Sequence, residues 1–203
     1  TESVDKLVTT AASHNRVFIL EVMGRDAGWI ALNAAIAGGA DVCIIPEIPY
    51  DIDKVKEKIE SRYKKGRGFC IIVVAEGSKN ANGEQVGMES QIPGDRHFKL
   101  GGIGEALKFE LQQAGIEHDI RVSVLGHLQR GGTPIAYDRV LASEFGVKAF
   151  ELAMEGEFGK MVAYKHPDII AVTFEEALRE PHLVSPDSFL VHTAKGLNIA
   201  FGD

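Results

Sequence analysis

The chain has 203 residues, of which 45% are hydrophobic and 25% are charged. This composition is typical of a globular protein with a buried core, so we expect one domain, with room for an appendage, and little disorder. The formal net charge of -7 argues against nonspecific binding to nucleic acid or to an anionic membrane surface. No run of about 18 apolar residues and no secretory signal segment is found, which predicts a cytoplasmic protein without a membrane span.

The predicted elements alternate between helix and strand from the first residues onward. Helical spacing of apolar residues begins almost at Thr1, which is not a methionine, so we expect the sequence to be part of a longer chain. Cys43 and Cys70 lie in apolar runs without metal-ligand spacing, which predicts two buried thiols and no metal site. After the first helix, the predicted elements up to residue 75 are a strand at Val17–Val22, a helix at Trp29–Ile36, a strand at Val42–Ile45, a helix from Ile52 to about Lys64, and a strand at Phe69–Ala75.

The segment from Gly77 to Gly102 interrupts this alternation, because it is polar, contains glycine and has no hydrophobic period. It is too long for an ordinary connection, so it is either an insertion or a functional loop. Residues 185–203 are expected to pack on the sheet as a tail. The elements predicted between these two segments are a helix at Ile103–Ala114, a strand at Arg121–Leu125, a helix at Tyr137–Met154, and two short strands, Met161–Tyr164 and Ile169–Val172, that finish the core. The alternation predicts an α/β fold, a Rossmann-like three-layer parallel sheet with helices on both faces.

Polar side chains follow three of the predicted strands, at the edge where open parallel sheets bind their ligands. The cations there suit a phosphate and the carboxylate suits hydroxyl groups, so together they predict a sugar-phosphate pocket. Each side chain alone also has a structural interpretation, such as an ion pair with a neighbouring helix or a histidine satisfied in the core. The three loops are Met23-Gly24-Arg25, Glu76-Gly77 and Gly126-His127-Leu128-Gln129-Arg130.

These loops, together with the sequences LGHLQRGGTP (residues 125–134) and YDRVLA (residues 137–142), closely resemble the 6-phosphofructokinases. The resemblance covers most of the chain, and residues 1–203 of this sequence correspond to the carboxyl-terminal part of a bacterial-type enzyme. It implies a glycolytic kinase that transfers a phosphoryl group from ATP, or from pyrophosphate, to fructose 6-phosphate and forms fructose 1,6-bisphosphate. The segment 77–102 resembles a branch of the family that contains enzymes of both donor types.

The resemblance also implies roles for individual residues. Arg25 would lie where charge develops on the transferring phosphoryl group. Arg16 and Arg121 would contact the substrate of an adjoining subunit, which implies a homodimer or homotetramer. The remaining fructose 6-phosphate contacts implied are Met23, Gly24, Glu76, His127 and Arg130.

Other family motifs are absent from this sequence. The phosphate-binding GGD segment is missing, as is the TIDND segment that carries the aspartate acting as general base. Most nucleotide contacts and the ligands of Mg²⁺ are expected in a missing amino-terminal half, so we expect little or no activity from the chain alone. The alternative is a non-catalytic sugar-phosphate-binding or assembly module. A dehydrogenase is disfavoured, because no glycine fingerprint follows the first strand.

Three residues correspond to the effector site of the allosteric bacterial enzymes, namely Asp41, Lys65 and Arg67. Phe69 stands where that pattern has a histidine, which puts effector binding in doubt. The structural alternative is a cationic helix terminus, which the helix dipole favours.

Overall fold

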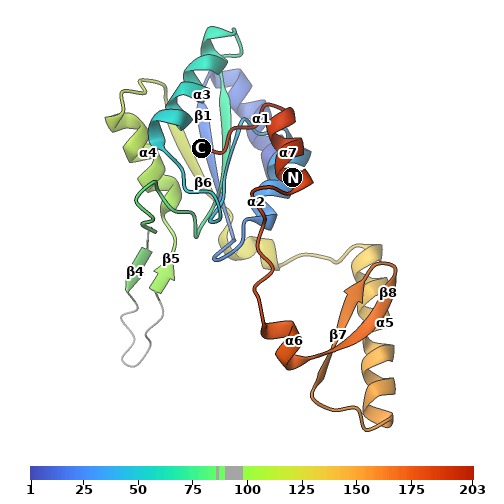
Figure 1. Cartoon of the computed structure of the whole chain (residues 1–203). Helices are drawn as coiled ribbons and strands as arrows, with labels where there is room; N and C mark the ends of the chain where they lie inside the picture. Colours follow the sequence, from blue (N-terminus) through green and yellow to red (C-terminus); the bar gives the residue numbers. More distant parts are fainter. Residues whose placement is uncertain (86, 90–97) are drawn as a thin grey trace. The chain divides into compact units, whose positions relative to one another are not determined.

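The computed structural model describes residues 1–85, 87–89 and 98–203, and the chain divides into two compact units (Figure 1). The first unit comprises residues 1–129 and 183–203, and the second comprises the residues between them. No helix among the described residues is both long enough and apolar enough to cross a lipid bilayer.

The first unit alternates helices and strands, which in chain order are α1 (Glu2–His14), β1 (Val17–Val22), α2 (Trp29–Gly38), β2 (Val42–Ile44), α3 (Ile52–Lys64), β3 (Cys70–Ala75), β4 (Gly87–Glu89), β5 (Phe98–Leu100), α4 (Ile103–Gln113), β6 (Ile120–Val124) and α7 (Phe189–Gly196). Four of the strands form a parallel sheet in the order β2-β3-β1-β6. β1 and β3 are buried along their whole length, as their nearly unbroken apolar sequences predict for strands covered on both faces.

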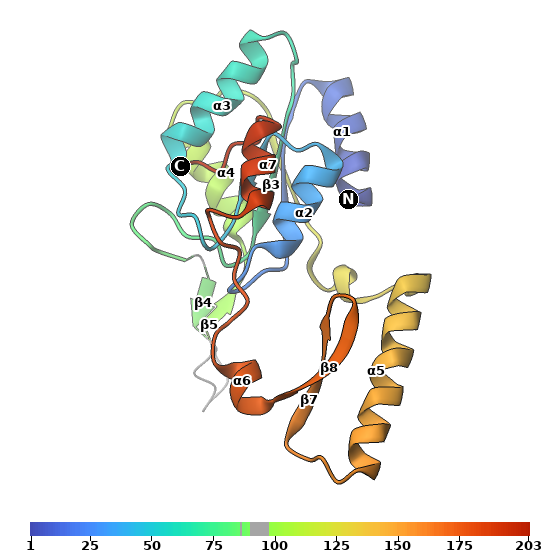
Figure 2. The ribbon, with the colours of Figure 1, turned by 45° about the vertical axis from the view of Figure 1, so that its right-hand side comes forward.

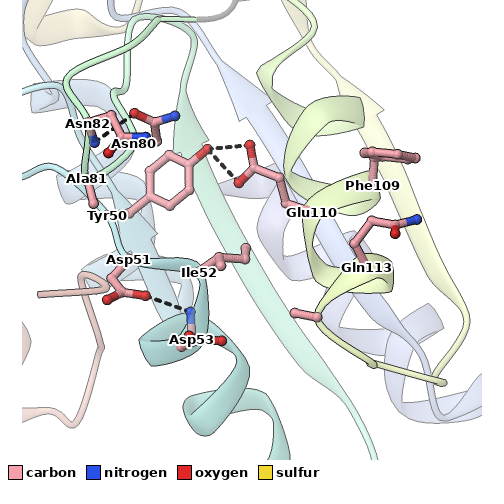
Figure 3. A pocket seen from close by; sticks show the side chains of 11 residues that line it. Tyr50, Asp51, Ile52, Asp53, Asn80, Ala81, Asn82, Phe109, Glu110 and Gln113 are labelled. Atoms are coloured by element: carbon pink, nitrogen blue, oxygen red, sulfur yellow. Dashed lines mark hydrogen bonds between the residues drawn. The ribbon is translucent and has the colours of Figure 1, made fainter.

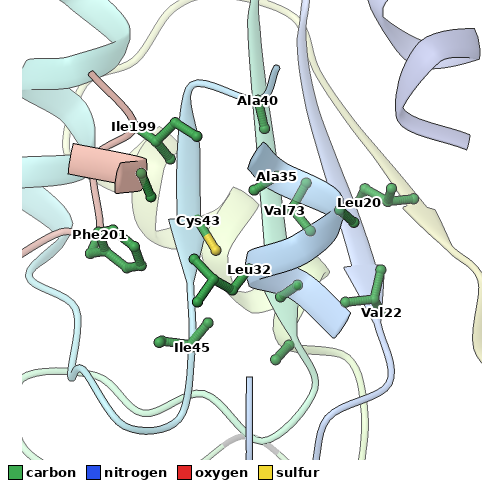
Figure 4. Close-up of a cluster of buried hydrophobic side chains, with 14 of the residues drawn as sticks. Leu20, Val22, Leu32, Ala35, Ala40, Cys43, Ile45, Val73, Ile199 and Phe201 are labelled. Carbon is green, nitrogen blue, oxygen red and sulfur yellow. The ribbon is translucent and has the colours of Figure 1, made fainter. Parts of the chain in front are cut away.

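Side chains of β1 alternate between two hydrophobic cores, one on each face of the sheet. Leu20 packs in the core formed with α1, α2 and α7, and Figure 4 shows it beside Val73, its neighbour on β3. Ile19 packs in the core formed with α3 and α4, and Figure 2 shows helices covering the sheet. The predicted α/β fold, a parallel sheet with helices on both faces, is thereby confirmed. Cys43 and Cys70 are buried free thiols, as predicted.

The one carboxylate within β1, Glu21, is buried and reaches the start of α4. It accepts hydrogen bonds from the backbone N–H groups of Gly102 (3.2 Å) and Gly104 (2.9 Å). Since Gly102 is the N-cap of α4 and offers no side-chain acceptor, Glu21 satisfies donors that the helix leaves unpaired at its beginning. The negative charge is also favourable at the positive end of the helix dipole.

Two segments of this unit differ from the sequence-based expectation. β4 and β5 lie within the long segment 77–102 and pair in antiparallel orientation, although residues 86 and 90–97 of that segment lie outside the described part. Strands of three residues are too short to show a hydrophobic period. α7 was also not predicted; beyond it, Ala200 forms a parallel bridge with Val42, so the end of the chain lies along β2.

The second unit contains α5 (Ala136–Met154), β7 (Lys160–Lys165), β8 (Asp168–Thr173) and α6 (Phe174–Leu178). Among the described strands, β7 and β8 pair only with each other, in antiparallel orientation. The expectation that these two strands finish the core of the parallel sheet was therefore wrong. Only His166 and Pro167 separate them, and a two-residue connection makes a hairpin, whereas neighbouring parallel strands need a crossover of a dozen residues or more.

Candidate active site

Three loops meet at the carboxyl edge of the parallel sheet. The strand register places Val22 beside Ala75, and Glu21 beside Val124. The residues that follow β1, β3 and β6 therefore leave the sheet next to one another. They begin the loops that the sequence marks as a sugar-phosphate site.

Hydrogen bonds join these loops directly. The N–H of Gly77 donates to the carbonyl of Gly24 at 3.0 Å, which fixes the loop after β3 to the loop after β1. The N–H of Met23 donates to Oε1 of Gln129 at 3.3 Å, and Nε2 of Gln129 donates to the carbonyl of Gly126 at 3.2 Å. Gln129 belongs to the 3-10 helix η1 (Gly126–Arg130), so this side chain bridges the loops after β1 and β6. Its bridging role was not predicted, because an amide side chain in a glycine-rich turn gives no signal of its partner.

Glycine at position 77 is required by the closeness of this packing. A Cβ atom there would lie 1.8 Å from the carbonyl oxygen of Arg25, far inside contact distance. Because that oxygen belongs to the backbone, a rotamer change cannot relieve the clash. The backbone at Arg25 therefore depends on the absence of a side chain at Gly77.

Replacing Gly77 by alanine is expected to lower the free energy of unfolding by about 1–3 kcal/mol, the usual cost of overpacking. Urea unfolding followed by the fluorescence of Trp29 measures this in the first unit, since the chain has one tryptophan. Gly196→Ala is the control, because Gly196 lies in α7 with no atom near its Cβ position. Equal stability of the two variants would show that the Arg25 loop adapts freely.

The side chains expected to contact substrate are accessible at this edge. Arg25 and His127 are exposed, and Glu76 and Met23 are partly buried. In the described part of the chain, no ion pair involves Arg25, so its guanidinium group is available to a ligand. Arg130 is exposed at the last position of η1 and is the first residue of the second unit. The first unit thus brings together five of the predicted residues, which are Met23, Gly24, Arg25, Glu76 and His127.

Arg16 and Arg121 lie at the opposite, amino edge of the sheet. Arg16 immediately precedes β1, and Arg121 pairs with Phe18, the second residue of that strand. Asp119 joins them, since one of its oxygens lies 2.6 Å from Nε of Arg16 and 3.1 Å from Nη2 of Arg121. Seven residue steps separate Arg16 from Met23, or about 23 Å at the rise of an extended strand. An arginine at the amino edge therefore cannot reach a ligand bound among the three loops of its own chain.

The candidate effector residues do not form one cationic site. Asp41 is buried, accepts a hydrogen bond from the N–H of Ile71 at 2.9 Å, and pairs with Nε of Arg62 at 2.7 Å. Arg67 and Asp41 line one hollow of about 230 Å³, and Lys65 is exposed at the end of α3 outside that lining. These contacts give Asp41 a structural role.

A second pocket, of about 510 Å³, opens between the start of α3, the turn at residues 80–82 and α4 (Figure 3). Tyr50 is buried there, and its hydroxyl donates to the carboxylate of Glu110 at 3.1 Å. The charged side chains of the lining are all acidic, being Asp51, Asp53 and Glu110. Such a lining repels phosphate, which leaves the three-loop edge as the better candidate for a sugar-phosphate site.

Within the described residues, no cluster of three histidine, cysteine or acidic side chains is placed to hold a metal ion.

Comparison with known proteins gives a consistent result. The sequence model of the family described as phosphofructokinase matches residues 1–153. The chain is 47% identical over its full length to ATP-dependent 6-phosphofructokinase 2 of Clostridium perfringens, covering 56% of that protein. It is 49% identical to ATP-dependent 6-phosphofructokinase 1 of Synechocystis sp., again over its full length and 55% of that protein. The structure of phosphofructokinase from Saccharomyces cerevisiae superimposes with a TM-score of 0.71 and 33% identity, covering 97% of this chain and 24% of that one. The chain thus spans slightly more than half the length of the curated relatives it matches.

Proposed function

Because this chain belongs to the phosphofructokinase family, we propose that it forms the acceptor side of an ATP-dependent 6-phosphofructokinase. It would bind fructose 6-phosphate and position it for transfer of the γ-phosphoryl group of ATP. The observation that carries the proposal is the joining of three loops at one sheet edge, where Arg25, Glu76 and His127 remain accessible. Pyrophosphate as donor is the less favoured alternative, since the relatives matched at 47% and 49% identity are named ATP-dependent.

The chemistry of each group suits its proposed role. Phosphoryl transfer needs mainly positioning and stabilisation of charge on the transferring group, which a guanidinium fork at Arg25 supplies. The carboxylate of Glu76 accepts hydrogen bonds from sugar hydroxyls, and His127 and Arg130 donate to the 6-phosphate. Met23 and Gly24 border the sugar, and the missing side chain of Gly24 lets the backbone approach it.

Arg16 and Arg121 complete the site in a second copy of the chain under this proposal. Their position at the amino edge, about 23 Å from Met23 along the strand for Arg16 and about 17 Å for Arg121, supports a role outside their own chain. The enzyme would then be a homodimer or homotetramer. The general base, the ATP contacts and the Mg²⁺ ligands would come from a segment outside these 203 residues, so we expect no efficient transfer by this chain alone.

Calorimetric titration of the chain with fructose 6-phosphate tests the proposal. Arg130→Ala is expected to weaken binding by roughly 1.5–3 kcal/mol, the usual range for a hydrogen bond to a charged group. Arg179→Ala, which removes an exposed arginine of the same unit, is expected to leave the affinity unchanged. Fructose without phosphate should bind more weakly than either variant binds the phosphate ester. Equal affinity for fructose and for fructose 6-phosphate would contradict the proposed hydrogen bonds from His127 and Arg130 to the phosphate.

A further inference from the structure

Glu47 lies in a tight turn just beyond the carboxyl end of β2. The N–H of Ile48 donates to the carbonyl of Ile45 at 3.2 Å, which closes this turn. The Glu47 side chain is partly buried and reaches the start of α2. Glu47 is not among the residues predicted to contact substrate.

The carboxylate of Glu47 accepts three hydrogen bonds from two backbone N–H groups. The N–H of Gly28 lies 3.1 Å from each carboxylate oxygen, and the N–H of Val184 lies 2.8 Å from Oε1. Charge-assisted bonds of this kind are among the stronger hydrogen bonds in proteins. Glu47 therefore ties together two segments far apart in sequence.

Gly28 is the N-cap of α2, and this helix provides no cap of its own. Glycine has no side-chain acceptor, and no acidic residue lies in the first turn of α2. The Glu47 carboxylate therefore satisfies a donor at the positive end of the helix from outside it. Only glycine fits there, because a Cβ atom at Gly28 would lie 2.3 Å from Cγ2 of Ile45.

The loop that carries Arg25 is thus fixed at both ends. At its start, the carbonyl of Gly24 accepts from the N–H of Gly77. At its end, Gly28 donates to Glu47. Arg25 lies one residue beyond the first anchor and three before the second. Without Glu47, the far end of the loop is held by the bond from the N–H of Leu32 to the carbonyl of Gly28, within α2, and the N–H of Gly28 is left unpaired.

We propose that Glu47 is a positioning residue that holds Arg25 in register with the transferring phosphoryl group. The inference rests on the proposed function, because it takes the role of Arg25 from there. The same carboxylate also fixes Val184, the second residue after the chain returns from the second unit. A movement of the backbone at Val184 would therefore be transmitted to the Arg25 loop through the side chain of Glu47.

Amide hydrogen exchange of the 203-residue chain tests the anchor without any activity. In Glu47→Ala, the amides of Gly28 and Val184 are expected to exchange at least about tenfold faster, while the amide of Gly77 keeps its rate. Glu57→Ala is the matched control, since Glu57 is an exposed carboxylate on α3 whose ion pair is with Lys54. Unchanged exchange at both Gly28 and Val184 would overturn the inference whatever the protein catalyses.

A double-mutant cycle in the full enzyme tests the positioning role. Glu47→Ala is expected to lower kcat by about 10- to 100-fold, the scale of a small misplacement of a catalytic group, with little change in KM for fructose 6-phosphate. Glu47→Gln, which keeps one acceptor oxygen, should recover part of this loss and covers the case in which Glu47→Ala folds poorly. Adding Glu47→Ala to Arg25→Ala should cost little more, because the two act through one group. Additive losses would overturn the inference, whereas failure of the proposed function would show as absent activity in the unsubstituted enzyme.

Discussion

Replacing Arg25 by alanine is expected to lower kcat about 10³-fold in a phosphofructokinase that contains this chain and the donor segment we propose. The guanidinium group is exposed, forms no ion pair within the described residues, and extends from a loop fixed at both ends. Because the backbone beneath it is already fixed, only the side chain has to be ordered when Arg25 meets a transition state. Steady-state kinetics with saturating ATP and varied fructose 6-phosphate measures the effect.

The division of the loss between kcat and KM identifies the role of Arg25. A cation that acts only on the transferring phosphoryl group leaves KM for fructose 6-phosphate within about threefold of its original value. Arg25→Lys keeps the charge without the planar guanidinium group, so its kcat should lie between those of the unsubstituted enzyme and Arg25→Ala. Arg179→Ala serves as the control for loss of a surface cation. A raised KM with unchanged kcat would instead make Arg25 a ground-state contact to the sugar phosphate.

The parallel sheet and the loops at its edge were predictable because they depend on local sequence. The apolar runs of β1 and β3 are continuous, and parallel strands present the residues that follow them at one edge. That rule alone places Met23, Glu76 and His127 near one another. The helices α1 and α3 were equally clear, since each shows an amphipathic spacing of buried residues.

What the sequence did not show depends on contacts between distant segments. Gln129 and Glu47 act through backbone N–H groups located 106 and 19 residues away, and a polar side chain gives no sign of which amide it will meet. The sequence predicted β7 and β8 as strands of the main sheet, because a short apolar strand has the same residue pattern in a parallel sheet and in a separate hairpin. The family resemblance named Arg16 and Arg121, but only the strand register shows that they lie at the edge opposite the other site residues.

Replacing Arg62 by alanine is expected to lower the free energy of unfolding by about 3–5 kcal/mol at neutral pH, the usual cost of leaving one partner of a buried ion pair alone. Asp41 and Arg62 have side chains only 8% and 14% exposed, and their charged atoms lie 2.7 Å apart. Arg62 also lies over the ring of Phe69, 5.5 Å from its centroid. Urea unfolding followed by Trp29 fluorescence measures the change. Arg67→Ala, which removes an exposed cation beside the same hollow, is expected to change stability by less than about 0.5 kcal/mol.

The pH dependence of this loss separates a buried charge from lost packing. Burial raises the pKa of Asp41 above its ordinary value, while the N–H of Ile71 and the charge of Arg62 oppose that rise. Without Arg62 the folded-state pKa rises further above the unfolded one, so the folded variant binds a proton more readily than the unfolded chain. Stability of Arg62→Ala relative to the unsubstituted protein should therefore recover as the pH falls from about 7 toward the ordinary pKa of an aspartate. A loss independent of pH would assign the role of Arg62 to its packing on Phe69, and a negligible loss would leave Asp41 free to serve an effector.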